Sequence, residues 1–154
     1  RSNETDDLGY PVFDYGAQAI ACEFVGGTAS NDLAVLRADK ADVFAVNDSV
    51  AAASVADGYA VGQTAIAIGN TEAEGISVTR GIVSVERESI TFNTGNTQDV
   101  LRIDTAIYSG NSGGGLFDLE GKLIGLANAR RTSDQNITVA APLSVVEGVA
   151  ATVL

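Results

Sequence analysis

The chain has 154 residues, which favours a single domain of ordinary size or two very small lobes. Its composition, 45% hydrophobic and 19% charged, is typical of a packed globular protein and excludes an intrinsically disordered acidic tail. Acidic residues outnumber basic ones 20 to 9, and the resulting formal charge of −11 disfavours nucleic acid as a partner. The single cysteine, Cys22, excludes an internal disulfide and a cysteine-built metal site, and the sequence contains no histidine.

Short apolar or alternating segments, separated by glycine and Asx turns, follow one another along the chain and predict β-strands. They lie at residues 17–25, 32–37, 63–68, 76–86, 89–92, 100–105, 115–118, 122–128 and 137–141. Gly81 interrupts the 76–86 segment and is expected to form a β-bulge. Cys22, in the first segment, is predicted to be a small buried hydrophobic residue. The alanine-rich residues 43–59 are expected to be an irregular crossing rather than a helix.

Pro142 begins an Ala- and Val-rich tail in which Val145, Val146, Val149 and Val153 share one helical face. Proline is tolerated in the first turn of a helix, so a short C-terminal helix is predicted. Regularly spaced short strands with one closing helix predict an all-β antiparallel barrel or sandwich. Because the sequence contains no methionine, we expect it to be an internal piece of a longer precursor.

The most informative local feature is the sequence Gly-Asn-Ser-Gly-Gly-Gly at residues 110–115. Glycine permits positive φ and close backbone approach, so successive amide N–H groups beside Ser112 can point into one concavity. Two such amides stabilise the oxyanion that forms when a serine attacks a carbonyl. Taken alone, the segment is equally compatible with a glycine-rich hairpin loop that contains an incidental serine.

Asp32 stands at the head of the apolar segment 33–37. A carboxylate in this place can orient an imidazole and stabilise its protonated form, although an aspartate there also serves as a simple turn residue. Asp32 precedes Ser112 in the chain, which fits the known triad order of histidine, aspartate and serine.

Four collinear segments resemble those of HtrA/Deg-type trypsin-like serine proteases, and the resemblance extends over roughly residues 22–146. These segments are NDLAVLR (31–37), VGQTAIAIGN (61–70), VTRGIVS (78–84) and LRIDTAIYSGNSGGGLFDLEGKLIGL (101–126). The resemblance implies a chymotrypsin-like double β-barrel, with Ser112 as nucleophile and Asp32 as the orienting carboxylate. It also implies an oxyanion hole made by the amides of Gly110 and Ser112. Such a mechanism needs no metal or organic cofactor.

The resemblance further divides the chain into two parts. Residues 1–56 correspond to a remnant of the first barrel and the crossing between barrels, and residues 57–154 to the second barrel plus the C-terminal helix. An incomplete first barrel leaves open strand edges, so we expect a missing N-terminal segment or another protomer to cover them.

Polypeptide substrates and a location outside the cytoplasm are expected by analogy with the family. In this fold the primary substrate pocket is walled by residues such as Ala106, Leu126, Ala127 and Asn128. Ala106 stands six residues before Ser112, where enzymes that cut after Lys or Arg carry an aspartate. Without that carboxylate a buried basic side chain would be unpaired, so a small or medium apolar side chain is expected.

The family's general base is a histidine, and this sequence has none. A serine hydroxyl is a poor nucleophile until a base takes its proton, so the chain alone is expected to have little or no peptidase activity. Two explanations remain open. Either the histidine lies in polypeptide that precedes residue 1, or the site has decayed into a non-catalytic protein-binding module.

Overall fold

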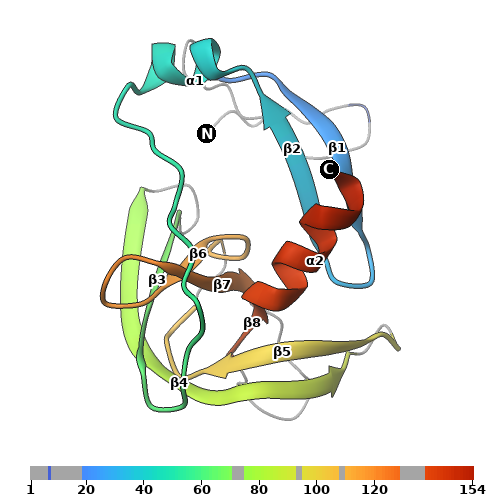
Figure 1. Cartoon of the computed structure of the whole chain (residues 1–154), viewed down its shortest axis with the longest axis vertical. Helices are drawn as coiled ribbons and strands as arrows, with labels where there is room; N and C mark the ends of the chain where they lie inside the picture. Colours follow the sequence, from blue (N-terminus) through green and yellow to red (C-terminus); the bar gives the residue numbers. More distant parts are fainter. Residues whose placement is uncertain (1–6, 8–18, 71–74, 93–94, 108–109, 129–137) are drawn as a thin grey trace.

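Two antiparallel sheets and two helices make up the described part of the chain (Figure 1). The computed structural model describes residues 7, 19–70, 75–92, 95–107, 110–128 and 138–154. Its elements are β1 (Cys22–Thr28), β2 (Leu33–Ala38), α1 (Lys40–Val46), β3 (Thr64–Asn70), β4 (Ile76–Thr91), β5 (Thr97–Ile103), β6 (Gly115–Phe117), β7 (Leu123–Asn128), β8 (Thr138–Pro142) and α2 (Leu143–Val153). Neither described helix is both long and apolar enough to cross a membrane.

The larger sheet is a closed barrel in the strand order β3-β4-β5-β8-β7-β6. Closure occurs where β3 pairs with β6, so that Ala67 lies opposite Leu116. The barrel is filled by small and branched apolar side chains that alternate along the strands, as the sequence pattern predicts. Its most buried members are Ala65, Val83, Leu101, Leu116, Ile124 and Ala140, each fully buried. Burial of a side chain such as Leu101 stabilises the fold by about 1.5–3 kcal/mol.

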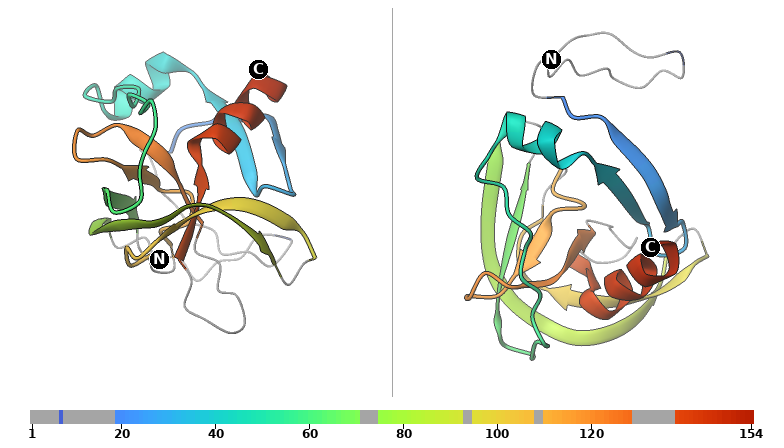
Figure 2. Two further views of the ribbon diagram at one scale, coloured as in Figure 1. Left: turned by 60° about the horizontal axis from the view of Figure 1, so that its bottom comes forward. Right: turned by 45° about the horizontal axis from the view of Figure 1, so that its top comes forward.

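The smaller sheet is a hairpin of β1 and β2, and α2 attaches it to the barrel. Helix α2 packs against β1 and β2 on one side and against β7 and β8 on the other, an arrangement visible in both views of Figure 2. The approach to β1 is close, because a Cβ on Gly26 would lie 2.7 Å from Cγ1 of Val153. The predicted C-terminal helix is thus confirmed, with Pro142 as its N-cap and Leu143 and Val149 buried.

Four local predictions were wrong. Residues 40–46 form helix α1, which begins because the Asp39 carboxylate accepts hydrogen bonds from the amides of Ala41 and Asp42, at 2.7 and 3.4 Å. The segments predicted as separate strands at 76–86 and 89–92 form one 16-residue strand, β4. Its register shifts against β5 fall between Val83 and Glu88, where the strand continues through irregular pairing instead of ending.

Gly81 lies in regular register opposite Ala65, so no bulge occurs there. Its lack of a side chain has another cause: a Cβ would lie 2.6 Å from Oγ1 of Thr105 and would also overlap the Asp104 carboxylate. Cys22 is exposed rather than buried. It lies at the start of β1, on a two-stranded sheet that covers too little surface to bury both of its faces.

Candidate active site

Ser112 is exposed on a tight loop that leads into β6. Gly110 and Gly113 have φ values of 95° and 87°, a left-handed conformation that glycine adopts without steric cost. Hydrogen bonds join this loop to β7: the Gly113 amide donates to the Ala127 carbonyl at 2.7 Å, and the Ala127 amide donates to the Gly114 carbonyl at 2.8 Å. The backbone around the serine is therefore held in place by a strand of the barrel.

Asn111, the residue before the serine, fixes the other side of the loop. Its side chain is buried, with only 3% of the residue exposed, and its Oδ1 accepts a hydrogen bond from Ser77 Oγ of β4 at 3.2 Å. The neighbouring position on β3 is Gly69, where a Cβ would lie 2.6 Å from the same Oδ1. Glycine is therefore needed at this position if Asn111 is to pack against the barrel.

Asp32 ends the tight turn that connects β1 to β2. Its amide donates to the Ala29 carbonyl at 3.3 Å, and its φ is 55°, a left-handed value that aspartate tolerates better than most residues. Strand β2 begins at the next residue, Leu33. The side chain is exposed, so the turn presents a carboxylate at the surface of the hairpin.

The structure brings Asp32 and Ser112 to one small cavity of about 50 Å³. Three of the four residues predicted to contact substrate, Leu126, Ala127 and Asn128 of β7, line the same cavity. The fourth, Ala106, does not line it; it is exposed, and its carbonyl accepts a hydrogen bond from Thr79 Oγ1 at 2.7 Å. Gly110 is also not among the residues that line the cavity.

Several residues that support the site were missed by the sequence reasoning. Besides Ser77 and Gly69, the Asp104 carboxylate accepts from the Ile82 amide at 2.6 Å, which fixes the segment that leads toward the serine loop. The sequence contained one signal for the missed contact of Asp104, which is Gly81. A glycine within a strand indicates either a bulge or a close approach of another chain segment, and here residues 104 and 105 approach it. Side-chain contacts such as that of Ser77 leave no local pattern.

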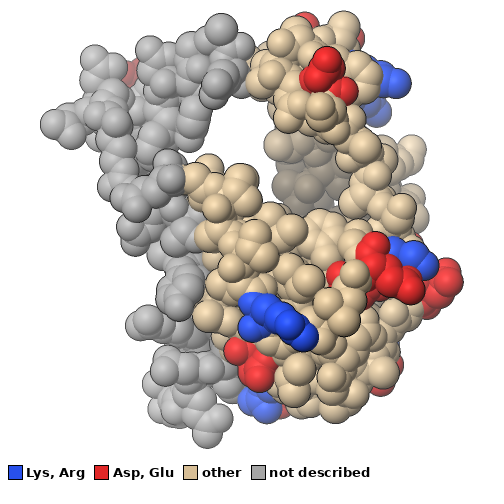
Figure 3. Space-filling model, turned by 90° about the vertical axis from the view of Figure 1, so that its left-hand side faces the viewer, with Lys and Arg blue, Asp and Glu red and all other residues tan. Residues whose placement is uncertain are grey.

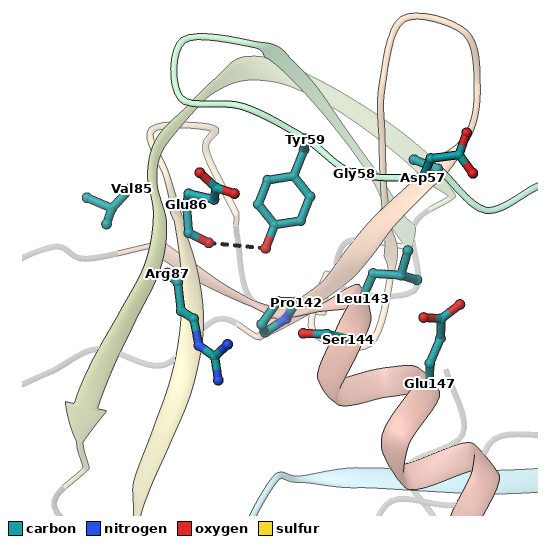
Figure 4. A pocket seen from close by; sticks show the side chains of 11 residues that line it. Asp57, Gly58, Tyr59, Val85, Glu86, Arg87, Pro142, Leu143, Ser144 and Glu147 are labelled. Atoms are coloured by element: carbon teal, nitrogen blue, oxygen red, sulfur yellow. Dashed lines mark hydrogen bonds between the residues drawn. The ribbon is translucent and has the colours of Figure 1, made fainter.

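A larger cavity of about 590 Å³ lies away from these residues, between residues 56–59, β4 and the start of α2 (Figure 4). Tyr59 extends into it, and its hydroxyl donates to the Glu86 carbonyl at 3.1 Å. Burial, and then the negative charge of Glu86, raise the pKa of this phenol. Neither Asp32 nor Ser112 lines this cavity, so the size of a cavity does not identify the candidate catalytic residues here.

Asp99 of β5 carries a carboxylate that has several side-chain donors on β4. Asp99 accepts a hydrogen bond from Ser89 Oγ at 2.6 Å and from Nε of Arg87 at 3.0 Å, with Nη2 of the same guanidinium as a further donor. These bonds, that from Ser89 foremost, lower the pKa of Asp99. No group of three or more His, Cys, Asp or Glu side chains that could hold a metal ion occurs within the described ranges.

A closed barrel whose glycine-rich serine loop meets an aspartate from a second sheet has the architecture of a chymotrypsin-like serine peptidase. The chain belongs to the trypsin-like peptidase domain family, whose sequence profile matches residues 7–126. It is 34% identical over 125 residues to a probable periplasmic serine endoprotease DegP-like of Bartonella henselae, with 81% of this chain and 24% of that protein covered. It is 33% identical over 128 residues to the serine protease Do-like HtrA of Bacillus subtilis, and this match covers 80% of this chain and 27% of that protein.

Solved structures agree with these relatives. The HtrA-type protease AlgW with a decapeptide has a TM-score of 0.72 and 31% identity, covering 87% of this chain and 40% of AlgW. A serine endoprotease from Yersinia pestis has a TM-score of 0.66 and 28% sequence identity, and the match covers 86% of this chain and 43% of that protein. The predicted chymotrypsin-like fold and the resemblance to HtrA-type proteases are thereby confirmed. The chain spans about a quarter of the length of the two curated relatives.

Proposed function

We propose that this chain is part of an HtrA-type serine endopeptidase in which Ser112 is the nucleophile and Asp32 orients the general base. The observation that carries the proposal is the shared cavity of Asp32 and Ser112, two residues supplied by different sheets. The loop geometry supports the assignment, because hydrogen bonds to β7 hold the backbone around the serine in one conformation. A fixed loop is what a preorganised oxyanion site requires.

In the proposed reaction, Ser112 Oγ attacks the carbonyl carbon of a peptide bond while an imidazole takes its proton. The amides of Gly110 and Ser112 stabilise the oxyanion, and the imidazolium, held by Asp32, returns the proton to the departing amine. Water then hydrolyses the acyl-enzyme by the same route in reverse. The sequence contains no histidine, so the imidazole comes from polypeptide outside these 154 residues, and this chain by itself is inactive.

We assign residues 1–56 to the remnant of the first barrel and the crossing, and residues 57–154 to the second barrel with α2. Phe24 and Leu36, register partners on β1 and β2, are 66% and 61% exposed. Figure 3 shows an open space between the part that contains α1 and the barrel. Both observations support a first barrel that is completed by further strands, from an N-terminal segment of the same protein or from another protomer.

The proposed substrates are polypeptides with a small or medium apolar side chain before the cleaved bond. Leu126, Ala127 and Asn128 support this specificity, since they line the cavity beside Ser112 and none carries a charge. Ala106 is proposed as a further wall of the same pocket. Solved structures of AlgW with a decapeptide and with a tripeptide support peptide recognition. A location outside the cytoplasm is supported by relatives that are named periplasmic.

A second function is a non-catalytic protein-binding module that kept the scaffold. The observation that favours it is the absence of histidine from the sequence, because a binding module needs no base. The two functions differ in one property. A peptidase site reacts with an electrophile at Ser112 when the upstream polypeptide is present, and a binding module does not.

Labelling with a fluorophosphonate probe tests the proposal. The 154-residue chain should remain unlabelled, whereas the protein that includes the residues encoded upstream of Arg1 should be labelled. Ser112→Ala should abolish labelling of that longer protein, and Ser49→Ala, at an exposed position of the crossing, should retain it. Labelling that survives Ser112→Ala would remove this serine from the mechanism. A longer protein with an intact fold and no labelling would favour the binding module.

A further inference from the structure

A buried glutamine of the barrel contacts the turn that carries Asp32. Gln98, the second residue of β5, is only 6% exposed, and its Nε2 donates a hydrogen bond to the carbonyl of Ser30. Ser30 belongs to the tight turn between β1 and β2, which ends at Asp32. This hydrogen bond therefore joins the barrel to the turn at a distance of 68 residues along the chain.

The surroundings of Gln98 make this bond important. Its register partner on β4 is Ile90, and directly opposed residues of an antiparallel pair lie on the same face of the sheet. Ile90 belongs to a second buried apolar cluster with Phe92, Val100 and Val139, separate from the cluster that fills the barrel. An amide donor that is buried beside apolar side chains pays a large desolvation cost unless it finds an acceptor. The Ser30 carbonyl is that acceptor.

Within the turn, the Asp32 amide donates to the Ala29 carbonyl at 3.3 Å, so Ser30 lies between two residues that are joined by a hydrogen bond. The hairpin is otherwise attached to the barrel through α2, whose Val153 touches Gly26 of β1. Helix α2 packs against both strands of the hairpin, and the bond from Gln98 adds a separate attachment at the turn, next to Asp32. Two separated points define the orientation of the hairpin, and hence the place of the Asp32 carboxylate at the cavity it shares with Ser112.

We infer that Gln98 is a positioning residue that holds the Asp32 turn in register with the Ser112 loop. Gln98 acts through Ser30 and does not line the cavity itself. The consequence for catalysis rests on the proposed function, in which Asp32 orients the base. The tether between barrel and hairpin does not depend on that function, so it can be tested separately.

The first test measures the tether in the 154-residue chain. Gln98→Met keeps the length and apolar contacts of the side chain and removes the donor. In the wild type, residual dipolar couplings of residues 29–36 should fit the same alignment tensor as those of the barrel strands, and a through-bond coupling from Gln98 Nε2 to the Ser30 carbonyl carbon should be detectable. In Gln98→Met the couplings of residues 29–36 should decrease while those of the barrel stay unchanged.

Thr97→Val is the matched control. Thr97 precedes Gln98 on β5 and is exposed, and its hydroxyl is hydrogen-bonded to that of Thr91 on β4 and not to the β1–β2 hairpin. This variant should retain the wild-type couplings throughout. If Gln98→Met prevents the barrel from folding, Gln98→Leu replaces it as a second variant that suits the apolar cluster. Couplings of residues 29–36 that stay at wild-type values in a folded variant without the donor would overturn the inference.

The second test measures turnover in the longer protein that carries the histidine. Misplacement of a catalytic group by about 1 Å can cost up to about 100-fold in rate, so Gln98→Met should lower kcat by roughly 10- to 100-fold. KM should change much less than kcat, because Leu126, Ala127 and Asn128, which line most of one wall of the cavity, belong to β7 of the barrel. An unchanged kcat would overturn the positioning role. A wild type without activity would instead refute the proposed function, and the coupling experiment would still decide whether the tether exists.

Discussion

The contact between Gly69 and Asn111 leads to the sharpest stability prediction. A Cβ at position 69 would lie 2.6 Å from Oδ1 of Asn111 and 3.0 Å from its Cα and Cγ. Asn111 is 3% exposed and cannot move outward without displacing the loop. Forcing a methyl group into a packed site costs about 1–3 kcal/mol. If the asparagine moves away, the 3.2 Å hydrogen bond from Ser77 is lost as well, at about 1 kcal/mol.

Alanine also restricts the unfolded chain, which returns about 0.4–1 kcal/mol of stability. The net expectation for Gly69→Ala is a loss of about 1–3 kcal/mol in the free energy of unfolding. Urea denaturation measures it, and with a slope of about 1–3 kcal/mol per molar the midpoint should fall by roughly 1 M. Gly58→Ala is the matched control, since a Cβ there meets nothing within 4 Å. If both variants unfold at the same urea concentration, the close approach of β3 to Asn111 does not constrain the fold.

Two further predictions concern the barrel and its charged hairpin. Leu101→Ala should lower the free energy of unfolding by about 2–5 kcal/mol, because this side chain is fully buried in the barrel. Leu119→Ala is the control, since this residue is 68% exposed, and it should change the free energy of unfolding by no more than about 0.5 kcal/mol. Equal effects of the two variants in urea denaturation would contradict the assignment of the core. Ser89→Ala should raise the pKa of Asp99 toward its ordinary value, since the hydrogen bond from Ser89 is the largest contribution that lowers it. A pKa that is lower in the folded state gives stability above the ordinary carboxyl pKa, and this stability is lost as the pH falls through the folded value. The loss of stability between neutral and acidic pH should therefore be smaller in Ser89→Ala, and an unchanged carboxyl titration of Asp99 by NMR would refute the reasoning.

Alternating apolar residues were sufficient to predict the barrel strands, because the period of two in a half-buried strand is a local property of the sequence. The strand 64–70 shows this well: Ala65 and Ala67 point inward, and Thr64 and Ile66 are less buried. The C-terminal helix was predicted for the same kind of reason, from the spacing of its valines. Patterns of this kind depend on neighbours in sequence and need no knowledge of the rest of the fold.

The residues of the candidate site also differ in whether a local sequence signal identifies them. Ser112 and Asp32 were found from local signals, the glycines around the serine and the strand that follows the aspartate, and the structure brings both to one cavity. Their chemical roles remain predictions. Ser77, Asp104 and Gln98 were missed because each acts through a contact with a residue distant in sequence. No spacing rule distinguishes such a serine or glutamine from one that faces solvent.

The errors have physical causes as well. Alanine-rich residues 43–59 contain too little periodicity to show a short helix, and the signal that was available was the capping carboxylate of Asp39, just before α1. Gly81 was predicted to be a bulge because a glycine in a strand has two readings, and only the structure shows that the chain at Thr105 approaches it. Cys22 was predicted to be buried from alternation alone, which cannot tell how much surface a two-stranded sheet covers.

The barrel closes through its shortest strand. Strand β6 has three residues, and each of its two ladders consists of three register pairs. Local opening of a folded protein starts where few backbone hydrogen bonds must break together. A thermal fluctuation that separates β6 from its neighbouring strands would also displace the adjoining Ser112 loop, while the longer β4–β5 ladder stays intact. The rigidity of the nucleophile candidate therefore depends on the hydrogen bonds of Asn111 and Ala127, which hold the loop from either side.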